Sequence, residues 1–217
     1  MVEIKNIEVF NLERAQRAIE NSFNVGEINT TKGSVKETLA RSLGGNKDFH
    51  QSHDAYLKGI LVSFDMKGNG VFMPEFQRYH FAEIIMSQST MHSMEKFMNT
   101  DYDPFSKYVS EETKNQIRKL YIEWKEAKKS KTPVQIYEAF ERLVHNLPRG
   151  FELWCTINSN YLQLKTIVIQ RAKHRNQEDW GAFVEACYSM PKFRELCGLT
   201  GSEWDLENIF PLYHFYK

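Results

Sequence analysis

Strand-like and helix-like segments alternate along this chain, and their order constrains the fold more than any other feature. Residues 2–10, VEIKNIEVF, alternate apolar and polar side chains and predict a strand. Helical patterns follow at 12–23 and 35–43, and a strand-rich run with a Gly-Asn-Gly turn follows at 56–72. A strand-like segment at 149–157 again precedes helical ones. The sequence therefore predicts a mixed α/β domain with strands and helices interleaved in both halves.

Two helices between these halves carry clear start signals. Ser110 can cap a helix at 111–131, whose acids lie early and whose lysines lie late, as the helix dipole favours. Thr132, Pro133 and Gln135 form a capping-box spacing that starts a second helix. The two helices are predicted to form a hairpin.

Composition limits the kind of protein. The 217 residues, 41% of them apolar, can form one core, and we interpret residues 1–217 as a single domain. The 28 Lys and Arg balance the 28 Asp and Glu, which argues against nucleic acid or an anionic membrane as partner. No apolar run approaches the roughly 20 residues of a membrane span. Cys155, Cys187 and Cys197 show no metal or redox spacing, so we predict reduced thiols and a cytoplasmic location.

Residues 72–94, FMPEFQRYHFAEIIMSQSTMHSM, combine polar and aromatic side chains. Pro74 suits the first turn of a helix, and Arg78 together with the hydroxyls and amide of 87–90 would suit a phosphate near a helix end. The alternative is that these hydroxyls cap a following helix at 91–98.

A second polar set lies on the helix predicted at 161–177. Asn160, Gln163, Arg171 and His174 are spaced 3, 8 and 3 apart and would line one side of it beside apolar residues. A buried arginine needs an anion or acceptors. The alternative is a solvated helix face with an internal ion pair.

Other chemistry has weaker signals. His50 and His53 form H-x-x-H without the Glu of H-E-x-x-H, and we predict no metal site. Cys155 has no adjacent base and is no expected nucleophile. The sequence contains neither G-x-G-x-x-G nor a P-loop, so any nucleotide would be held by side chains from several elements.

The stretch RYHFAEIIMSQSTMH resembles the signature R-H-R-x-x-S-x-N-E-x-S-x-R-Y of the flavin-dependent thymidylate synthases, with two extra residues between its halves. The matching positions are Arg78 and His80 for the first two arginines, Gln88 for the acidic or amide position, Thr90 for the serine and His92 for the last arginine.

A second family motif, W-T-x-N-x-R-x-L followed by an Arg and a His, is similar to WCTINSNYLQLKTIVIQRAKHR. Asn158 or Asn160 takes the place of the asparagine, Arg171 that of the helix arginine and His174 that of the histidine. His53 corresponds to the family's histidine before the hairpin. The resemblance covers roughly residues 45 to 180 in the family's order.

The resemblance implies a central, mostly antiparallel sheet flanked by helices, in a homotetramer with shared active sites. It implies reductive methylation of a pyrimidine nucleotide such as dUMP: NADPH reduces FAD, methylenetetrahydrofolate supplies the carbon, and no enzyme cysteine attacks the pyrimidine. Arg171 is the implied catalytic residue. The implied FAD ligands are His53, Arg78, His80, Gln88, Asn158, Asn160, Gln163 and His174, and the implied dUMP ligands are Ser89, Thr90, His92 and Arg171.

Two departures from the family motifs bear on function. Arg-His-Arg is Arg78-Tyr79-His80 here, and the last arginine is His92, so two fixed charges are replaced by groups that titrate near neutral pH. Each charge-assisted hydrogen bond lost would cost about 1.5 to 3 kcal/mol of anion binding. The alternatives are therefore a related pyrimidine nucleotide hydroxymethylase, or a non-catalytic nucleotide-binding or oligomeric interaction protein that kept the fold.

Overall fold

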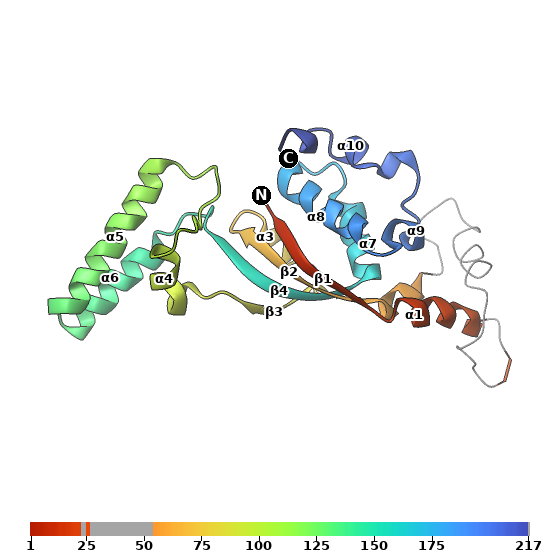
Figure 1. Ribbon diagram of the computed structural model, residues 1–217, viewed down its shortest axis with the longest axis horizontal. Helices are drawn as coiled ribbons and strands as arrows, with labels where there is room; N and C mark the ends of the chain where they lie inside the picture. The colour runs from red at the N-terminus through yellow and green to blue at the C-terminus, as the bar shows by residue number, and fades with distance from the viewer. Residues whose placement is uncertain (23–24, 27–53, 217) are drawn as a thin grey trace. The chain divides into compact units, whose positions relative to one another are not determined.

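A four-stranded antiparallel sheet in the order β1-β2-β4-β3 organises the chain (Figure 1). The computed structural model describes residues 1–22, 25–26 and 54–216. The strands are β1 (Glu3–Phe10), β2 (Leu61–Asn69), β3 (Glu83–Ser87) and β4 (Glu152–Asn160). The predicted mixed α/β fold with an antiparallel sheet is confirmed.

The chain divides into two compact units. The first unit comprises Met1–Met66, Phe76–Ile85 and Thr156–Lys217, and the second comprises Lys67–Glu75 and Met86–Cys155. Strands β2, β3 and β4 each have residues in both units. The single functional domain expected from chain length stays a prediction.

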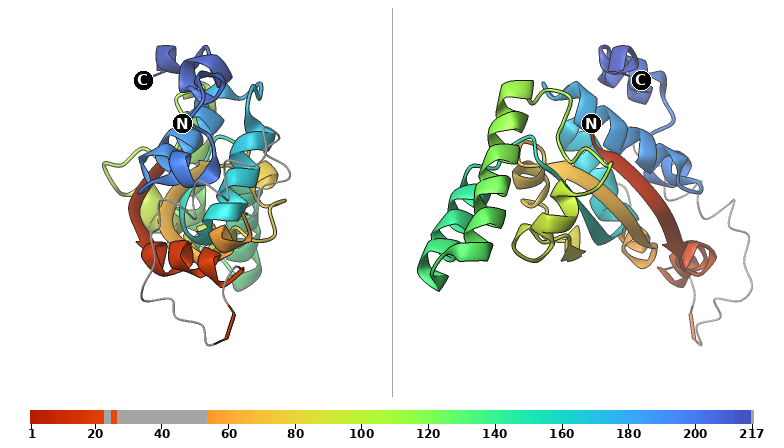
Figure 2. Two further views of the ribbon diagram at one scale, coloured as in Figure 1. Left: turned by 90° about the vertical axis from the view of Figure 1, so that its right-hand side faces the viewer. Right: turned by 60° about the vertical axis from the view of Figure 1, so that its left-hand side comes forward.

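In the first unit, α7 (Tyr161–Arg171) and α8 (Gln177–Ser189) lie along one face of the strands (Figures 1 and 2). Strand β2 buries Val62, Phe64 and Met66, which alternate along the strand and so face one side. Phe64 meets Phe183 of α8 edge to face, with ring centroids 6.5 Å apart. The unit's helical segments are α1 (Leu12–Ala18), η1 (Ile19–Ser22), η3 (Ala55–Gly59), α7 (Tyr161–Arg171), α8 (Gln177–Ser189), α9 (Phe193–Cys197), η4 (Ser202–Trp204), α10 (Leu206–Ile209) and η5 (Tyr213–Tyr216).

The opposite face of these strands is polar. Asp65 of β2 accepts hydrogen bonds from Asn6 of β1 at 2.8 Å and from Thr156 of β4 at 2.7 Å. These two hydrogen bonds lower the pKa of the Asp65 carboxyl, because they stabilise its charged form. The polar bonds therefore link three neighbouring strands on the side that turns away from Phe64.

The second unit contains the predicted helical hairpin. Helices α5 (Glu111–Ser130) and α6 (Pro133–His145) lie side by side in both figures. Trp124 and Phe140 join them with ring centroids 4.9 Å apart. Helix α4 (Thr90–Met98) contributes Met94 and Phe97 to the same core. None of the helices in the described part of the chain is long and apolar enough to cross a bilayer.

The capping box at the start of α6 gives a stability prediction. Gln135 N donates to Thr132 Oγ1 at 3.4 Å, and Thr132 N donates to Gln135 Oε1 at 3.1 Å. We expect Thr132→Ala to lower the free energy of unfolding by about 1 kcal/mol, because an N-terminal amide of α6 loses its acceptor. Urea unfolding measures the change. Ser130→Ala, at the exposed end of α5, is the matched control, and an equal loss in both variants would contradict the prediction.

The helix predicted from Pro74 onward is wrong in length. Helix α3 (Met73–Phe76) makes a single turn, and the chain then turns and enters β3. Phe76 ends the helix, and Tyr79 and Ala82 are buried between exposed residues rather than along a continuing helix face. The polar segment therefore runs through a turn and an edge strand before it reaches α4.

Candidate functional site

Helix α7 is shorter than its sequence pattern predicted. It begins after Asn160, whose Oδ1 accepts from Gln163 N at 3.0 Å, and it ends at Arg171. A 1.5 Å rise per residue puts Asn160 and Arg171 about 16 Å apart, at opposite ends. His174 lies beyond the helix, after Lys173 at φ 63°. The prediction that His174 continues the helical line of Asn160, Gln163 and Arg171 is therefore wrong.

Arg171 instead belongs to an aromatic cluster in the first unit. Its Nε donates to the Tyr79 hydroxyl at 2.8 Å. Its guanidinium carbon lies 4.4 Å from the ring centroid of Trp180 and 5.3 Å from that of Tyr79. These distances are within the range of cation–π attraction. Arg171 is thus a half-buried cation held by two aromatic residues, which differs from a solvated helix face.

His174 also packs against this indole. Its ring centroid lies 6.0 Å from that of Trp180, at an interplanar angle of 69°. Asn176 N donates to His174 Nδ1 at 3.2 Å, so Nδ1 acts as acceptor and a neutral ring carries its proton on Nε2. Arg171 and His174 are therefore two predicted site residues that the structure brings to one aromatic residue.

The segment that contains Arg78 and His80 contacts this cluster through Tyr79, the residue between them. Both side chains belong to exposed residues in the turns between α3 and β3, whereas Tyr79 is 9% exposed. Tyr79 is the residue that contacts Arg171. Two segments about 90 residues apart in sequence thus meet, and the contact is made by Tyr79.

Four further predicted residues lie in the second unit, at the start of α4. Ser89 caps the helix, since its Oγ accepts from His92 N at 3.3 Å, and Thr90 is the first helical residue. Gln88 accepts from Trp154 N through Oε1 at 3.0 Å, and its own N donates to Trp154 O at 2.9 Å. The capping alternative thus accounts for Ser89, and the binding roles of Ser89, Thr90, His92 and Gln88 stay predictions.

Asn158 lies on β4, two residues after Thr156 and therefore on the same polar face of the sheet. Asn158 is exposed. The face on which it lies is opposite to the face from which Phe64 contacts Phe183 of α8. Gln163 is half-buried in the first turn of α7. The predicted amides are thus distributed over the sheet and the start of α7. His53 lies outside the described residues.

The cysteines are poor nucleophiles. Cys155, Cys187 and Cys197 are free and buried. Burial raises the pKa of the Cys187 and Cys197 thiols, because a thiolate is poorly solvated there. Among the residues that the structure describes, no group of three His, Cys, Asp or Glu side chains could hold a metal ion.

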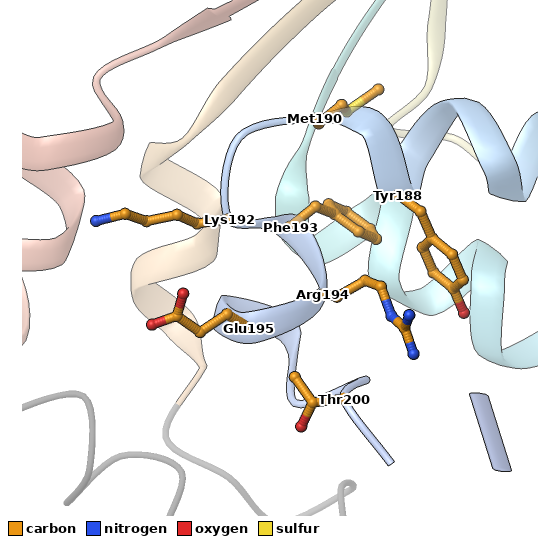
Figure 3. A pocket seen from close by; sticks show the side chains of 7 residues that line it. All are labelled: Tyr188, Met190, Lys192, Phe193, Arg194, Glu195 and Thr200. Carbon is orange, nitrogen blue, oxygen red and sulfur yellow. The ribbon is translucent and has the colours of Figure 1, made fainter. Parts of the chain in front are cut away.

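A hollow of about 320 Å³ lies elsewhere in the first unit, around α9 (Figure 3). Arg194 lies beside Tyr188 there, whereas Lys192 and Glu195 point away from them. Arg194 is also bonded to Asp205 and to the Leu199 carbonyl. The lining residues are Tyr188, Met190, Lys192, Phe193, Arg194, Glu195 and Thr200. None of the predicted site residues lines this hollow, and its charged groups do not converge.

Tyr79 and Trp180 are the residues of the cluster that sequence reasoning missed. The sequence patterns assigned neither of them a role in a site. One signal could have pointed to Tyr79. It replaces the histidine of the Arg-His-Arg motif and lies between Arg78 and His80, two residues that the family resemblance implies as FAD ligands.

Comparisons with known proteins support the fold resemblance. No protein-family model and no curated protein matches the sequence. Among solved structures, two crystal structures of the flavin-dependent thymidylate synthase ThyX from Helicobacter pylori, both with FAD and dUMP, are similar. One is 13% identical with a TM-score of 0.59, and covers 90% of this chain and 95% of its own. The other is 16% identical with a TM-score of 0.61, at 90% and 96% coverage. The chain has this fold, as predicted.

Proposed function

We propose that this protein binds a pyrimidine nucleotide such as dUMP together with FAD, and transfers one carbon to the pyrimidine from methylenetetrahydrofolate with NADPH as reductant. The observation that carries the proposal is the guanidinium of Arg171, held by Tyr79 and Trp180 within a fold whose solved relatives bind FAD and dUMP. A fixed arginine fork suits the oxygens of a phosphate or a pyrimidine carbonyl.

The chain's own groups fit this role by their chemistry. Arg171 would bind and orient the nucleotide, and His174 would present its Nε2–H beside the same indole. The proposed FAD ligands include Arg78 and His80, which are exposed and carry nitrogen donors. They also include the side-chain amides of Asn158 on the sheet and Gln163 in α7. FAD, when bound, would carry the reducing equivalents of the reaction. The protein would contribute orientation and exclusion of water.

The hydrogen-bonding groups of these residues are also of the type that a flavin needs. A flavin ring presents hydrogen-bond donors and acceptors along one edge, and the side-chain amides of Asn158 and Gln163 offer both. The pyrophosphate of FAD needs cations, and Arg78 is exposed on a turn where a ligand can reach it. Ligand roles for Gln88, Asn160, Ser89, Thr90, His92 and His53, and a homotetramer with shared active sites, are further parts of the proposal.

Copurification tests this function. We expect the purified protein to carry or take up flavin, with an absorbance band near 450 nm, roughly where oxidised flavins absorb. Calorimetry should then show dUMP binding, and incubation with dUMP, methylenetetrahydrofolate and NADPH should produce dTMP. The proposal would be contradicted if the protein bound neither FAD nor dUMP. Light scattering at about four times the 25.6 kDa chain mass would support the tetramer.

A second candidate is a nucleotide-binding protein without turnover. His80 and His92 stand where the family motif has arginines, and both are exposed. Binding of FAD and dUMP without any dTMP, from pH 6 to 8, would favour this candidate over the enzyme. A hydroxymethylated product in the same assay would favour the hydroxymethylase.

A further inference from the structure

Two thioether side chains flank the segment that leads into α4. Met86 of β3 is 73% exposed, and Met91, in the first turn of α4, is 51% exposed. We infer that Met86 and Met91 are a modification site at which hydrogen peroxide oxidises methionine to its sulfoxide, and that oxidation of Met91 weakens nucleotide binding at the start of α4. The effect on binding rests on the proposed function, in which Ser89, Thr90 and His92 bind dUMP.

The other six methionines of the chain are less accessible. Met1 is 38% exposed, Met73 and Met98 are half-buried, and Met66, Met94 and Met190 are buried. A thioether must meet peroxide from solution before it can react, so the rate of oxidation follows exposure. The reaction should therefore be fastest at Met86 and Met91.

Hydrogen bonds hold the backbone between the two methionines. Gln88 N donates to Trp154 O at 2.9 Å, and Gln88 Oε1 accepts from Trp154 N at 3.0 Å, which ties the segment to β4. Ser89 Oγ then accepts from His92 N at 3.3 Å and caps α4. The exposure of the two thioethers is therefore a property of an ordered strand end and helix start.

The oxidation needs hydrogen peroxide and no other group of the protein. A lone pair of the methionine sulfur attacks one oxygen of the peroxide, the O–O bond breaks, and the other oxygen leaves as water once it has taken up the proton. The sulfur is oxidised and the peroxide is reduced by the same electron pair. The product is a polar sulfoxide, whose oxygen accepts hydrogen bonds where an apolar thioether stood.

The sulfoxide of Met91 competes for the amides that start α4. Side chains of a helix point back toward its N-terminal end, so the new oxygen is directed toward the first-turn N–H groups. The bond from His92 N to Ser89 Oγ, at 3.3 Å, is slightly longer than the usual range and can be replaced by a new acceptor. Ser89 then loses its fixed orientation, and with it part of its affinity for the nucleotide.

Peptide mass spectrometry after a timed exposure to hydrogen peroxide tests the site. We expect Met86 and Met91 to gain one oxygen atom each at least about tenfold faster than Met94, because the Met94 side chain is buried. Met94 is the internal control, since it lies one turn after Met91 in the same helix. Oxidation of Met94 as fast as Met91 would overturn the site.

Calorimetry with dUMP on oxidised, FAD-loaded protein tests the consequence. We expect the wild type to lose affinity about fivefold on oxidation, the equivalent of one neutral hydrogen bond, and Met91→Leu to lose none. The matched control is Met86→Leu, which keeps the thioether of Met91 and should lose affinity like the wild type. Methionine sulfoxide reductases, which reduce the sulfoxide, should restore the affinity. An equal loss in oxidised Met91→Leu, or no loss in the fully oxidised wild type, would overturn the role of Met91.

A measurement without nucleotide separates this inference from the proposed function. The ¹⁵N–¹H signal of His92 should shift on oxidation of the wild type and of Met86→Leu, and should stay in place in Met91→Leu. An unchanged His92 signal in the oxidised wild type would overturn the action on the helix cap. If the reduced protein binds no dUMP, the proposed function fails, while selective oxidation together with the shift at His92 would still support the modification site.

Discussion

The Arg171→Ala variant is expected to bind dUMP at least a hundredfold more weakly than the wild-type protein. A guanidinium that meets two oxygens makes two charge-assisted hydrogen bonds, each contributing about 1.5 to 3 kcal/mol, and alanine removes both. Their sum, about 3 to 6 kcal/mol, corresponds to a factor of more than a hundred in affinity. Calorimetry on the FAD-loaded variant measures the loss.

Two other variants make this result specific. Arg171→Lys keeps the charge but has no fork, and we expect it to recover only part of the lost affinity. Arg194→Ala removes a second arginine that stacks on a tyrosine of the first unit and is bonded to Asp205 at 2.7 Å. It should lower stability and leave dUMP affinity unchanged. Wild-type affinity in Arg171→Ala would instead mean that the arginine serves only to cover Trp180.

The parts of the fold with strong local signals could be predicted. Ser110 and Thr132 cap α5 and α6 as their sequences indicate, because a hydroxyl that accepts a first-turn amide depends only on residues three positions away. Strand β1 was likewise evident from its alternation. Such signals are local, so no knowledge of the tertiary structure was needed.

The segment after Pro74 could not be predicted in the same way. Proline suits a first helical turn whether that helix continues or stops. Strand β3 is an edge strand with four of its five residues exposed, so it has no apolar alternation to mark it. Its exit is defined by Gln88, which pairs with Trp154 of β4 through both side chain and backbone. Only that long-range pairing shows that this segment forms a strand and does not continue the helix.

The candidate site shows the same limit. The sequence identified Arg171 and His174 by residue type, and the resemblance placed them in one motif. Their common neighbour Trp180 was missed, because the turn after α7 brings it beside them and no periodic pattern crosses that turn. Tyr79 is 92 residues from Arg171, and only tertiary packing joins them. Residue types thus suggested the chemistry, and packing determined which groups meet.

Replacing Trp180 by alanine is expected to lower the free energy of unfolding by about 3 to 5 kcal/mol, because the largest side chain of the buried core would leave a cavity. Trp180 is 0% exposed and contacts Tyr79, Phe183, His174 and Arg171. Urea unfolding followed by circular dichroism measures the loss. A loss below about 0.5 kcal/mol, the size of a typical surface change, would contradict the packing.

The conservative variant Trp180→Phe separates packing from recognition. A phenyl ring keeps most of the buried surface, so we expect about 1 to 2 kcal/mol of stability to be lost. It offers a weaker cation–π partner than indole, and Arg171 loses part of the contact that fixes its plane. If Trp180 orients the guanidinium, dUMP affinity should fall severalfold in a variant that remains folded. Unchanged affinity in Trp180→Phe would leave Trp180 a role in stability alone.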